Sequence, residues 1–177
     1  MKKIIINNLN LSDDITEILD WENRYAGSDG LENIKHFVLE DNAYLSLAEV
    51  IDVNYQKFAI GGDERKFALA FRDEANKLLG FTLNSIIDLD TTSPELLIQY
   101  VVINPEHQGK GIAKQALSSL LSDPQKYYGY DVKKSFAKID RFNVMSRKLF
   151  ESLGFELYCT NSNFLSAIRD ENTQEKY

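Results

Sequence analysis

The chain has 177 residues, enough for one domain with its own core, and its 44% hydrophobic and 27% charged residues are near the averages for globular proteins. A net charge of −7 argues against a nucleic-acid partner, because phosphate backbones attract clustered positive charge. A single cysteine, Cys159, excludes an internal disulfide and fits a reducing, cytoplasmic compartment.

The N-terminal third is expected to hold one strand followed by helices. Three isoleucines at 4–6 predict the strand, and no apolar run here is long enough for a signal peptide or a membrane span. Ser12 is a candidate N-cap for a helix that would run to Gly27. Residues 31–53 predict one broken helix or two short ones. We expect a single domain over 1–169 and a polar tail over 170–177.

The rest of the chain predicts a series of strands with a helix after two of them. Turn residues at 73–76 join the first two strands into a hairpin. Cys159 falls at the end of a short apolar segment and is expected to be a buried strand thiol. The expected strands are 67–71, 78–87, 96–103, 136–139, 155–159 and 164–168, and the expected helices begin after Gly111 and at Asn143.

An anion-binding turn is expected after strand 96–103. Asn104-Pro105 cannot continue a central strand, and apolar residues at helical spacing begin at Ile112. The glycines Gly109 and Gly111 therefore lie at a helix N-terminus, where unpaired amides and the helix dipole attract an anion such as a diphosphate. A nucleotide P-loop requires Ser or Thr after its Gly-Lys pair. Here Lys110 is followed by Gly111, so a P-loop is excluded. Alternatively, the two glycines only make a turn.

Two motifs in this region resemble those of the GNAT acetyltransferases. The first is Gln108-x-x-Gly111-x-Ala113, with Pro105 before it, and the second is Asn143-x-x-Ser146-x-x-Leu149-Phe150-x-x-x-Gly154-Phe155. The resemblance covers about residues 95–158, roughly a third of the chain. Both motifs occurring together and in this order are far more specific than either one alone.

The resemblance implies an α/β (α+β) fold and a co-substrate. The fold is a mixed, mostly antiparallel sheet of six to seven strands flanked by about four helices, with two central strands that splay apart. Acetyl-CoA would lie between these strands, and no metal would take part. Asn143 would lie near the pantetheine arm, or would alternatively serve only as a helix N-cap. The implied cofactor-binding residues are Val101, Val102, Ile103, Gln108, Gly109, Lys110, Gly111, Ile112, Ala113 and Asn143.

The usual catalytic positions of the family hold apolar residues here. Leu97 stands where many members have a glutamate base. Glu95 shares its strand face by the period-two rule and is a candidate base acting through water, or alternatively a surface carboxylate. Phe150 stands where the family often has a tyrosine that protonates the leaving thiolate. Tyr158, and less directly Tyr100, are candidate acids or alternatively packing aromatics.

The expected function is acetyl-CoA-dependent transfer of an acetyl group to a primary amine of a small molecule or peptide. The alternatives are a non-catalytic acyl-CoA-binding module and a protein that keeps only the fold. Early aromatic and histidine side chains would line the acceptor pocket or simply pack. These are Trp21, Tyr25, His36 and Tyr44. The protein is expected to act as a monomer or homodimer.

Overall fold

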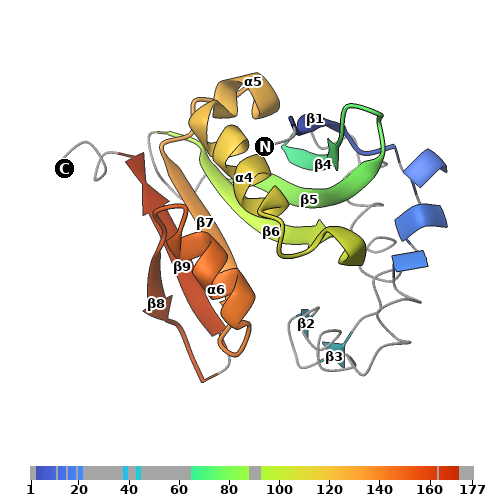
Figure 1. Ribbon diagram of the computed structural model, residues 1–177. Coiled ribbons are helices and arrows are strands. Elements are labelled where there is room, and N and C mark those ends of the chain that lie inside the picture. The colour runs from blue at the N-terminus through green and yellow to red at the C-terminus, as the bar shows by residue number, and fades with distance from the viewer. Residues whose placement is uncertain are drawn as a thin grey trace.

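The computed structural model describes residues 3–10, 12–14, 16–18, 20–21, 38–39, 43–44, 65–87, 93–162 and 164–171. A seven-stranded sheet runs through it (Figure 1). Its strands are β1 (Ile5–Asn8), β4 (Lys66–Arg72), β5 (Leu78–Ile87), β6 (Glu95–Ile103), β7 (Lys134–Asp140), β8 (Glu156–Cys159) and β9 (Phe164–Asp170). The helices are η2 (Pro105–His107), α4 (Ile112–Ser122), α5 (Pro124–Tyr128) and α6 (Val144–Glu151).

The sheet is mixed and mostly antiparallel, as predicted. Its strand order is β1-β4-β5-β6-β7-β9-β8, and every neighbouring pair is antiparallel except β6 and β7. Parallel neighbours need a crossover connection, and the segment holding α4 and α5 supplies it. This crossover carries the glycine loop from the end of β6 onto one face of the sheet.

The two central strands separate, which confirms the splayed pair implied by the resemblance. β5 pairs with β6 as far as Ile103, whereas β7 pairs with β6 only over its first four residues, from Glu95 to Ile98. From Gln99 onward β6 and β7 diverge, as Figure 1 shows. The register of β5 against β6 also shifts at this point, because Leu83 is opposite Tyr100 while Asn84 is opposite Ile98. Gln99 is therefore the extra residue of a β-bulge.

Apolar side chains cover both faces of the sheet. The larger cluster joins one face to α4, α5 and α6 (Figure 1), with Leu117 and Leu96 at its centre, both 0% exposed. The smaller cluster covers the opposite face, where Ile18 and Trp21 from the helical segments 16–18 and 20–21 pack on Phe81. A sheet covered on both faces has fully buried central strands, and nine of the ten residues of β5 are buried.

The N-terminal third differs in two respects from what the sequence predicts. Ser12 is itself helical and is not the cap; its hydroxyl donates to Asn10 Oδ1 (2.7 Å). A two-stranded sheet, β2 (Val38–Leu39) with β3 (Ala43–Tyr44), lies where helices were expected. Val38 favours a strand, and the intervening Asp-Asn sequence favours a turn, so local residue preference outweighed the apolar spacing. The predicted helix end at Gly27 lies outside the described residues.

Cys159 is exposed, which corrects the expected buried thiol. It ends β8, which pairs with β9 alone and forms one edge of the sheet. Three of the four residues of this edge strand are exposed. An edge strand lacks a neighbour on one side, so an apolar-looking segment there stays accessible to solvent. Asp170, where the polar tail was expected to begin, is the last residue of β9 and lies opposite Lys134.

Gly80 allows β5 to approach the end of β6, and its replacement should be costly. A Cβ added there would lie 2.4 Å from the Val102 carbonyl oxygen and 2.7 Å from Ile103 Cδ1. We expect Gly80→Ala to lower the free energy of unfolding by about 1–3 kcal/mol, because the obstruction includes backbone of a central strand. Urea unfolding measures the change. An unfolding free energy equal to that of the wild type would contradict this close approach.

Candidate active site

The loop after β6 is built by two glycines in the left-handed region. Gly109 has φ +70° and Gly111 has φ +78°, and Gly111 is the N-cap of α4. Residues with a Cβ rarely adopt this conformation, which explains both glycines. A Cβ built at either position would meet no atom within 4 Å, so the space above the loop is open. A bound group can therefore come close to the loop backbone here.

The first amides of α4 face this open space. An α-helix leaves its first N–H groups without partners inside the helix, and Gly111 has no side chain with which to cap them. No acidic residue lies in the first turn of α4, which instead carries Lys114. The partial positive charge of the helix end is thus uncompensated and suits a phosphate group.

Side chains within the loop hold its shape. Asn104 Oδ1 accepts from the Glu106 amide (3.0 Å), Gln108 Nε2 donates to the Ile103 carbonyl (3.3 Å), and Lys110 Nζ donates to the Glu106 carbonyl (2.5 Å). Gln108 and Lys110 were predicted to bind the cofactor. Both contact loop carbonyls here, so in this structure they stabilise the turn itself.

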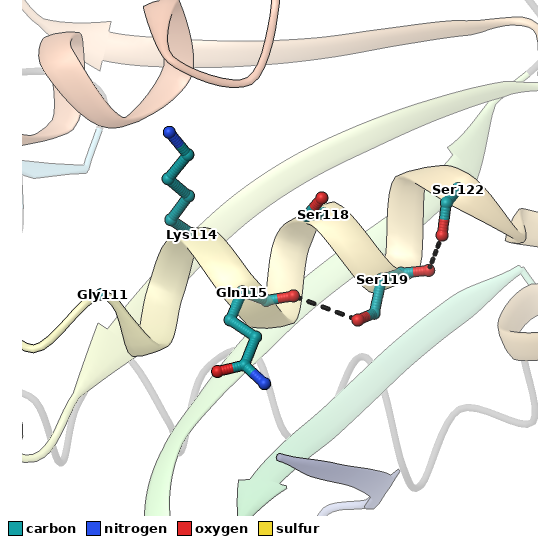
Figure 2. A pocket seen from close by; sticks show the side chains of 6 residues that line it. All are labelled: Gly111, Lys114, Gln115, Ser118, Ser119 and Ser122. Atoms are coloured by element: carbon teal, nitrogen blue, oxygen red, sulfur yellow. Dashed lines mark hydrogen bonds between the residues drawn. The ribbon is translucent and has the colours of Figure 1, made fainter. Parts of the chain in front are cut away.

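A groove of about 450 Å³ runs from the loop along the exposed face of α4 (Figure 2). Lys114 stands at the end of the groove near Gly111 and points away from the helix. Two serine hydroxyls bond carbonyls of the helix itself: Ser119 Oγ donates to Gln115 O (3.1 Å), and Ser122 Oγ to Ser119 O (3.0 Å). The groove therefore extends the surface of the glycine loop along α4.

Along β6, the backbone N–H and C=O groups of successive residues point alternately toward β5 and toward β7. The Asn104 amide donates to the Leu79 carbonyl (2.9 Å), which fixes the side that faces β5. Residues two apart on a strand face the same side, so Val102 and Tyr100 also present their peptide groups to β5. Val101 and Ile103 present theirs to the side from which β7 has diverged. Of the three predicted backbone positions, Val101 and Ile103 thus face the opening and Val102 faces β5.

Asn143 is the N-cap of α6, at the mouth of the diverging strands. Its Oδ1 accepts from the Ser146 amide (2.9 Å), and its own amide donates to the Asp140 carbonyl (3.0 Å). Asn143 therefore does cap α6. The cap uses the side-chain oxygen, which leaves the amide nitrogen as the group that would contact a pantetheine arm. That contact stays a prediction.

Glu95 is buried at the start of the central strand β6 and is not the surface carboxylate that was the alternative interpretation. It is 3% exposed, lies opposite Ile87 and Lys134, and begins β6. Its Oε2 has no hydrogen-bond partner in the part of the chain that the structure describes. Leu96 packs in the cluster beneath α4, so strand alternation places Glu95 on the opposite face, four residues before Gln99, or about 13 Å along the strand.

Phe150, at the family's usual acid position, and the candidate acid Tyr158 both lie away from Glu95. Phe150 is 5% exposed and packs edge-to-face on Phe155, with 5.0 Å between ring centroids. Tyr158 lies on the edge strand β8, two strands away from β7, and its hydroxyl donates to the Glu156 carboxylate. That hydrogen bond raises the pKa of Tyr158, and the carboxylate charge adds to the effect. A role for Tyr158 as an acid stays a prediction, and this placement argues against it.

The expected acceptor residues are only partly described. Trp21 is 1% exposed and stacks on Phe81, with ring centroids 6.4 Å apart, so it fills the core and does not line a pocket. Tyr25 and His36 lie outside the described residues, and Tyr44 is described only as part of β3. Within the described ranges, no helix is long and apolar enough to cross a membrane, and no three metal-ligating side chains group together.

His107, to which the sequence assigned no role, is a loop residue whose pKa departs from the ordinary histidine value. Its burial lowers its pKa, and the charges of Lys110 and Lys77 lower it further. The native state thus binds a proton less readily than the unfolded chain, and stability rises with pH through the ordinary histidine value of about 6.5. We expect the loss of unfolding free energy between pH 7.5 and 5.5 to be smaller in His107→Gln. Urea unfolding at both pH values measures this loss, and an equal loss in the wild type and in His107→Gln would contradict the expectation.

Comparisons with known proteins now identify the family. The family model described as the acetyltransferase (GNAT) family matches residues 17–155, most of the chain. The chain belongs to the GNAT acetyltransferase family. A search of curated proteins finds no match. The GNAT fold agrees with the splayed sheet and with the loop before α4.

Solved structures share this GNAT fold at low sequence identity. An acetyltransferase from Thermus thermophilus has a TM-score of 0.67 at 15% identity, covering 96% of this chain and 99% of that one. Spermidine N-acetyltransferase from Vibrio cholerae, solved with CoA and spermine, has 0.65 at 19%, covering 96% of each chain. PaiA N-acetyltransferase from Thermoplasma acidophilum, solved with coenzyme A, has 0.60 at 20%, covering 95% and 99%.

Proposed function

We propose that this chain transfers the acetyl group of acetyl-CoA to a primary amine by direct attack. The observation that carries the proposal is the N-terminus of α4, capped by Gly111 in the left-handed conformation, which follows η2 and the glycine loop after a strand that diverges from its neighbour. The diphosphate would bind the amides of residues 108–113, with open space above both glycines. The pantetheine arm would pair with the peptide groups of Val101 and Ile103, which face the opening.

The amine must lose a proton before it attacks the thioester carbonyl. A free alkylammonium has a pKa of about 10.4, so only about one molecule in a thousand is neutral at pH 7. We assign Glu95 as the base, acting through water. Two observations support it: its Oε2 lacks a partner in the described structure, and a polar pair lies beyond Leu97 in the direction of the opening, where Ser85 Oγ donates to Gln99 Oε1 (2.9 Å).

The leaving thiolate does not require a tyrosine at position 150. A thiol has a pKa of about 8.5, so the coenzyme A thiolate can leave without full protonation. The carbon–sulfur bond breaks as the new amide bond forms, and the thiolate takes its proton from solvent. The buried Phe150 is consistent with this pathway because it has no proton to donate.

The proposed acceptor is a cationic small-molecule or peptide amine. The chain carries a net charge of −7, which favours the approach of cations. A structural neighbour from Vibrio cholerae is a spermidine N-acetyltransferase solved with spermine. Polyamines therefore belong first in the panel of acceptors.

A second candidate is an acyl-CoA-binding module without turnover, favoured by the apolar residues at both usual catalytic positions, Leu97 and Phe150. Incubation with acetyl-CoA and a panel of amines, with free thiol followed over time, separates the two functions. Amine-dependent thiol release together with acetylated amine supports the enzyme. Retention of coenzyme A without thiol release supports the binding module. The absence of both results would refute the proposed function and the alternative.

A further inference from the structure

Two fully buried polar side chains stand in the middle of β5, where apolar side chains would be expected. Thr82 and Asn84 are both 0% exposed, and they share one face of the strand because they are two residues apart. Tyr128 of α5, 3% exposed, reaches them from the helical layer. Burying a polar group is costly unless it is hydrogen-bonded, so the bonds made by these groups indicate what they hold in place.

Their hydrogen bonds lead to the backbone of β6. The Thr82 hydroxyl donates to the Tyr100 carbonyl (2.7 Å) and lies 3.0 Å from Asn84 Oδ1. Asn84 Nδ2 donates to the Tyr128 hydroxyl (3.1 Å). The Tyr128 ring packs edge-to-face on Phe67, with 5.1 Å between centroids, and its burial raises the pKa of the phenol, which stays protonated. The network thus joins α5, β5 and β6.

This network lies where the central strands begin to separate. Thr82 and Asn84 flank Leu83, and the register shift that makes Gln99 the extra residue falls between Leu83 and Asn84. Bulges bend a strand and redirect its peptide groups. β7 leaves β6 after Ile98, one residue before the bulge. The network therefore anchors the backbone where the acyl end of the donor would lie.

The bond from Thr82 fixes the direction of one peptide group in particular. The carbonyl of Tyr100 and the amide of Val101 belong to the same planar unit and point in opposite directions. The Tyr100 carbonyl faces its partner strand β5, and Thr82 bonds it there, so the Val101 N–H points to the side from which β7 has diverged. A rotation of this peptide plane would move the N–H out of the opening.

We propose that Thr82, Asn84 and Tyr128 are positioning residues that hold the Val101 amide toward the thioester end of the acyl donor. The inference rests on the proposed function and adds a determinant of the rate of transfer that lies outside both family motifs. It distinguishes two ends of the site: the glycine loop governs how tightly coenzyme A binds, and the network governs how well the acetyl group is placed.

The test compares Thr82→Val, which removes the hydroxyl at nearly constant shape, with Thr82→Ser, which keeps it. A misplacement of about 1 Å lowers rates as much as about a hundredfold, and we expect Thr82→Val to lower acetyl transfer about tenfold or more. Coenzyme A affinity, measured by calorimetry, should change less than about threefold. Thr82→Ser should recover most of the rate. Tyr128→Phe should have a smaller effect, because the Tyr128 hydroxyl contacts Asn84 and reaches the Tyr100 carbonyl only through Asn84 and Thr82.

Controls separate the network from folding and from the function itself. Thr160→Val makes the same change at the exposed pair with Ser166 and should keep the wild-type rate. The ¹³C shift of the Tyr100 carbonyl should move in Thr82→Val and not in Thr82→Ser. A Thr82→Val rate equal to wild type, or a loss that Thr82→Ser shares, would overturn the inference. A wild-type protein without coenzyme A binding would instead refute the proposed function, and the inference with it.

Discussion

Gly111→Asp is expected to weaken coenzyme A binding at least about tenfold, or about 1.4 kcal/mol. The aspartate side chain would enter the open space above the loop, where a Cβ meets no atom within 4 Å. Its charge would repel the diphosphate and would neutralise the helix end that is meant to attract it. Isothermal titration calorimetry with coenzyme A measures the loss directly.

Gly129→Asp is the matched control for this change. Gly129 also has a left-handed φ of +75° with no atom near an added Cβ, but it ends α5 and does not belong to the loop. Both variants therefore carry similar backbone strain and the same added charge. Equal coenzyme A affinities for the two folded variants would show that the loop does not bind the diphosphate.

Glu95→Gln should lower the rate of acetyl transfer about ten- to a thousandfold near neutral pH, because glutamine cannot accept the proton of the amine. The deficit should shrink as pH approaches the amine's own pKa of about 10.4, where neutral acceptor is abundant. The rate is measured from pH 6 to 10 with the acceptor found in the amine panel. This pH-dependent recovery distinguishes a base from a residue that only shapes the sheet.

Glu151→Gln, at an exposed position of α6, serves as the control and should match the wild type throughout. Glu95→Gln should remain folded, because it replaces a buried carboxylate with a neutral group of the same shape. A Glu95→Gln rate equal to that of the wild type across the whole pH range would exclude this base. The fold and the loop assignment would stand, and another group would have to accept the proton.

Strands with strong local patterns could be predicted from the sequence. The hairpin strands were expected at 67–71 and 78–87 and are observed as Lys66–Arg72 and Leu78–Ile87. The loop and α4 could be predicted because proline, two glycines and helical apolar spacing occur in a single stretch. Helix α5 was missed although its capping residues were present: Asp123 Oδ1 accepts from the Lys126 amide (3.1 Å), and Gly129 ends it.

The parts of the site that depend on distant contacts could not be predicted in this way. Glu95 looked like a surface residue beside a polar loop, whereas it is buried in a strand that lies between β5 and β7. The polar residues Thr82 and Asn84 gave no indication of a network, because their partners lie 18 and 44 residues away in sequence. Such contacts are set by the sheet topology, which local residue preferences do not encode.

The most direct test of the account is a titration of the ¹⁵N-labelled protein with coenzyme A, followed by amide chemical shifts. The amides of Gly109, Gly111 and Ile112 are expected to shift together with those of Val101 and Ile103, while those of the edge strand β8 are not. Saturable shifts in both groups would place the ligand along the opening and on the loop. Spectra unchanged at millimolar coenzyme A, or shifts confined to other parts of the sheet, would contradict it.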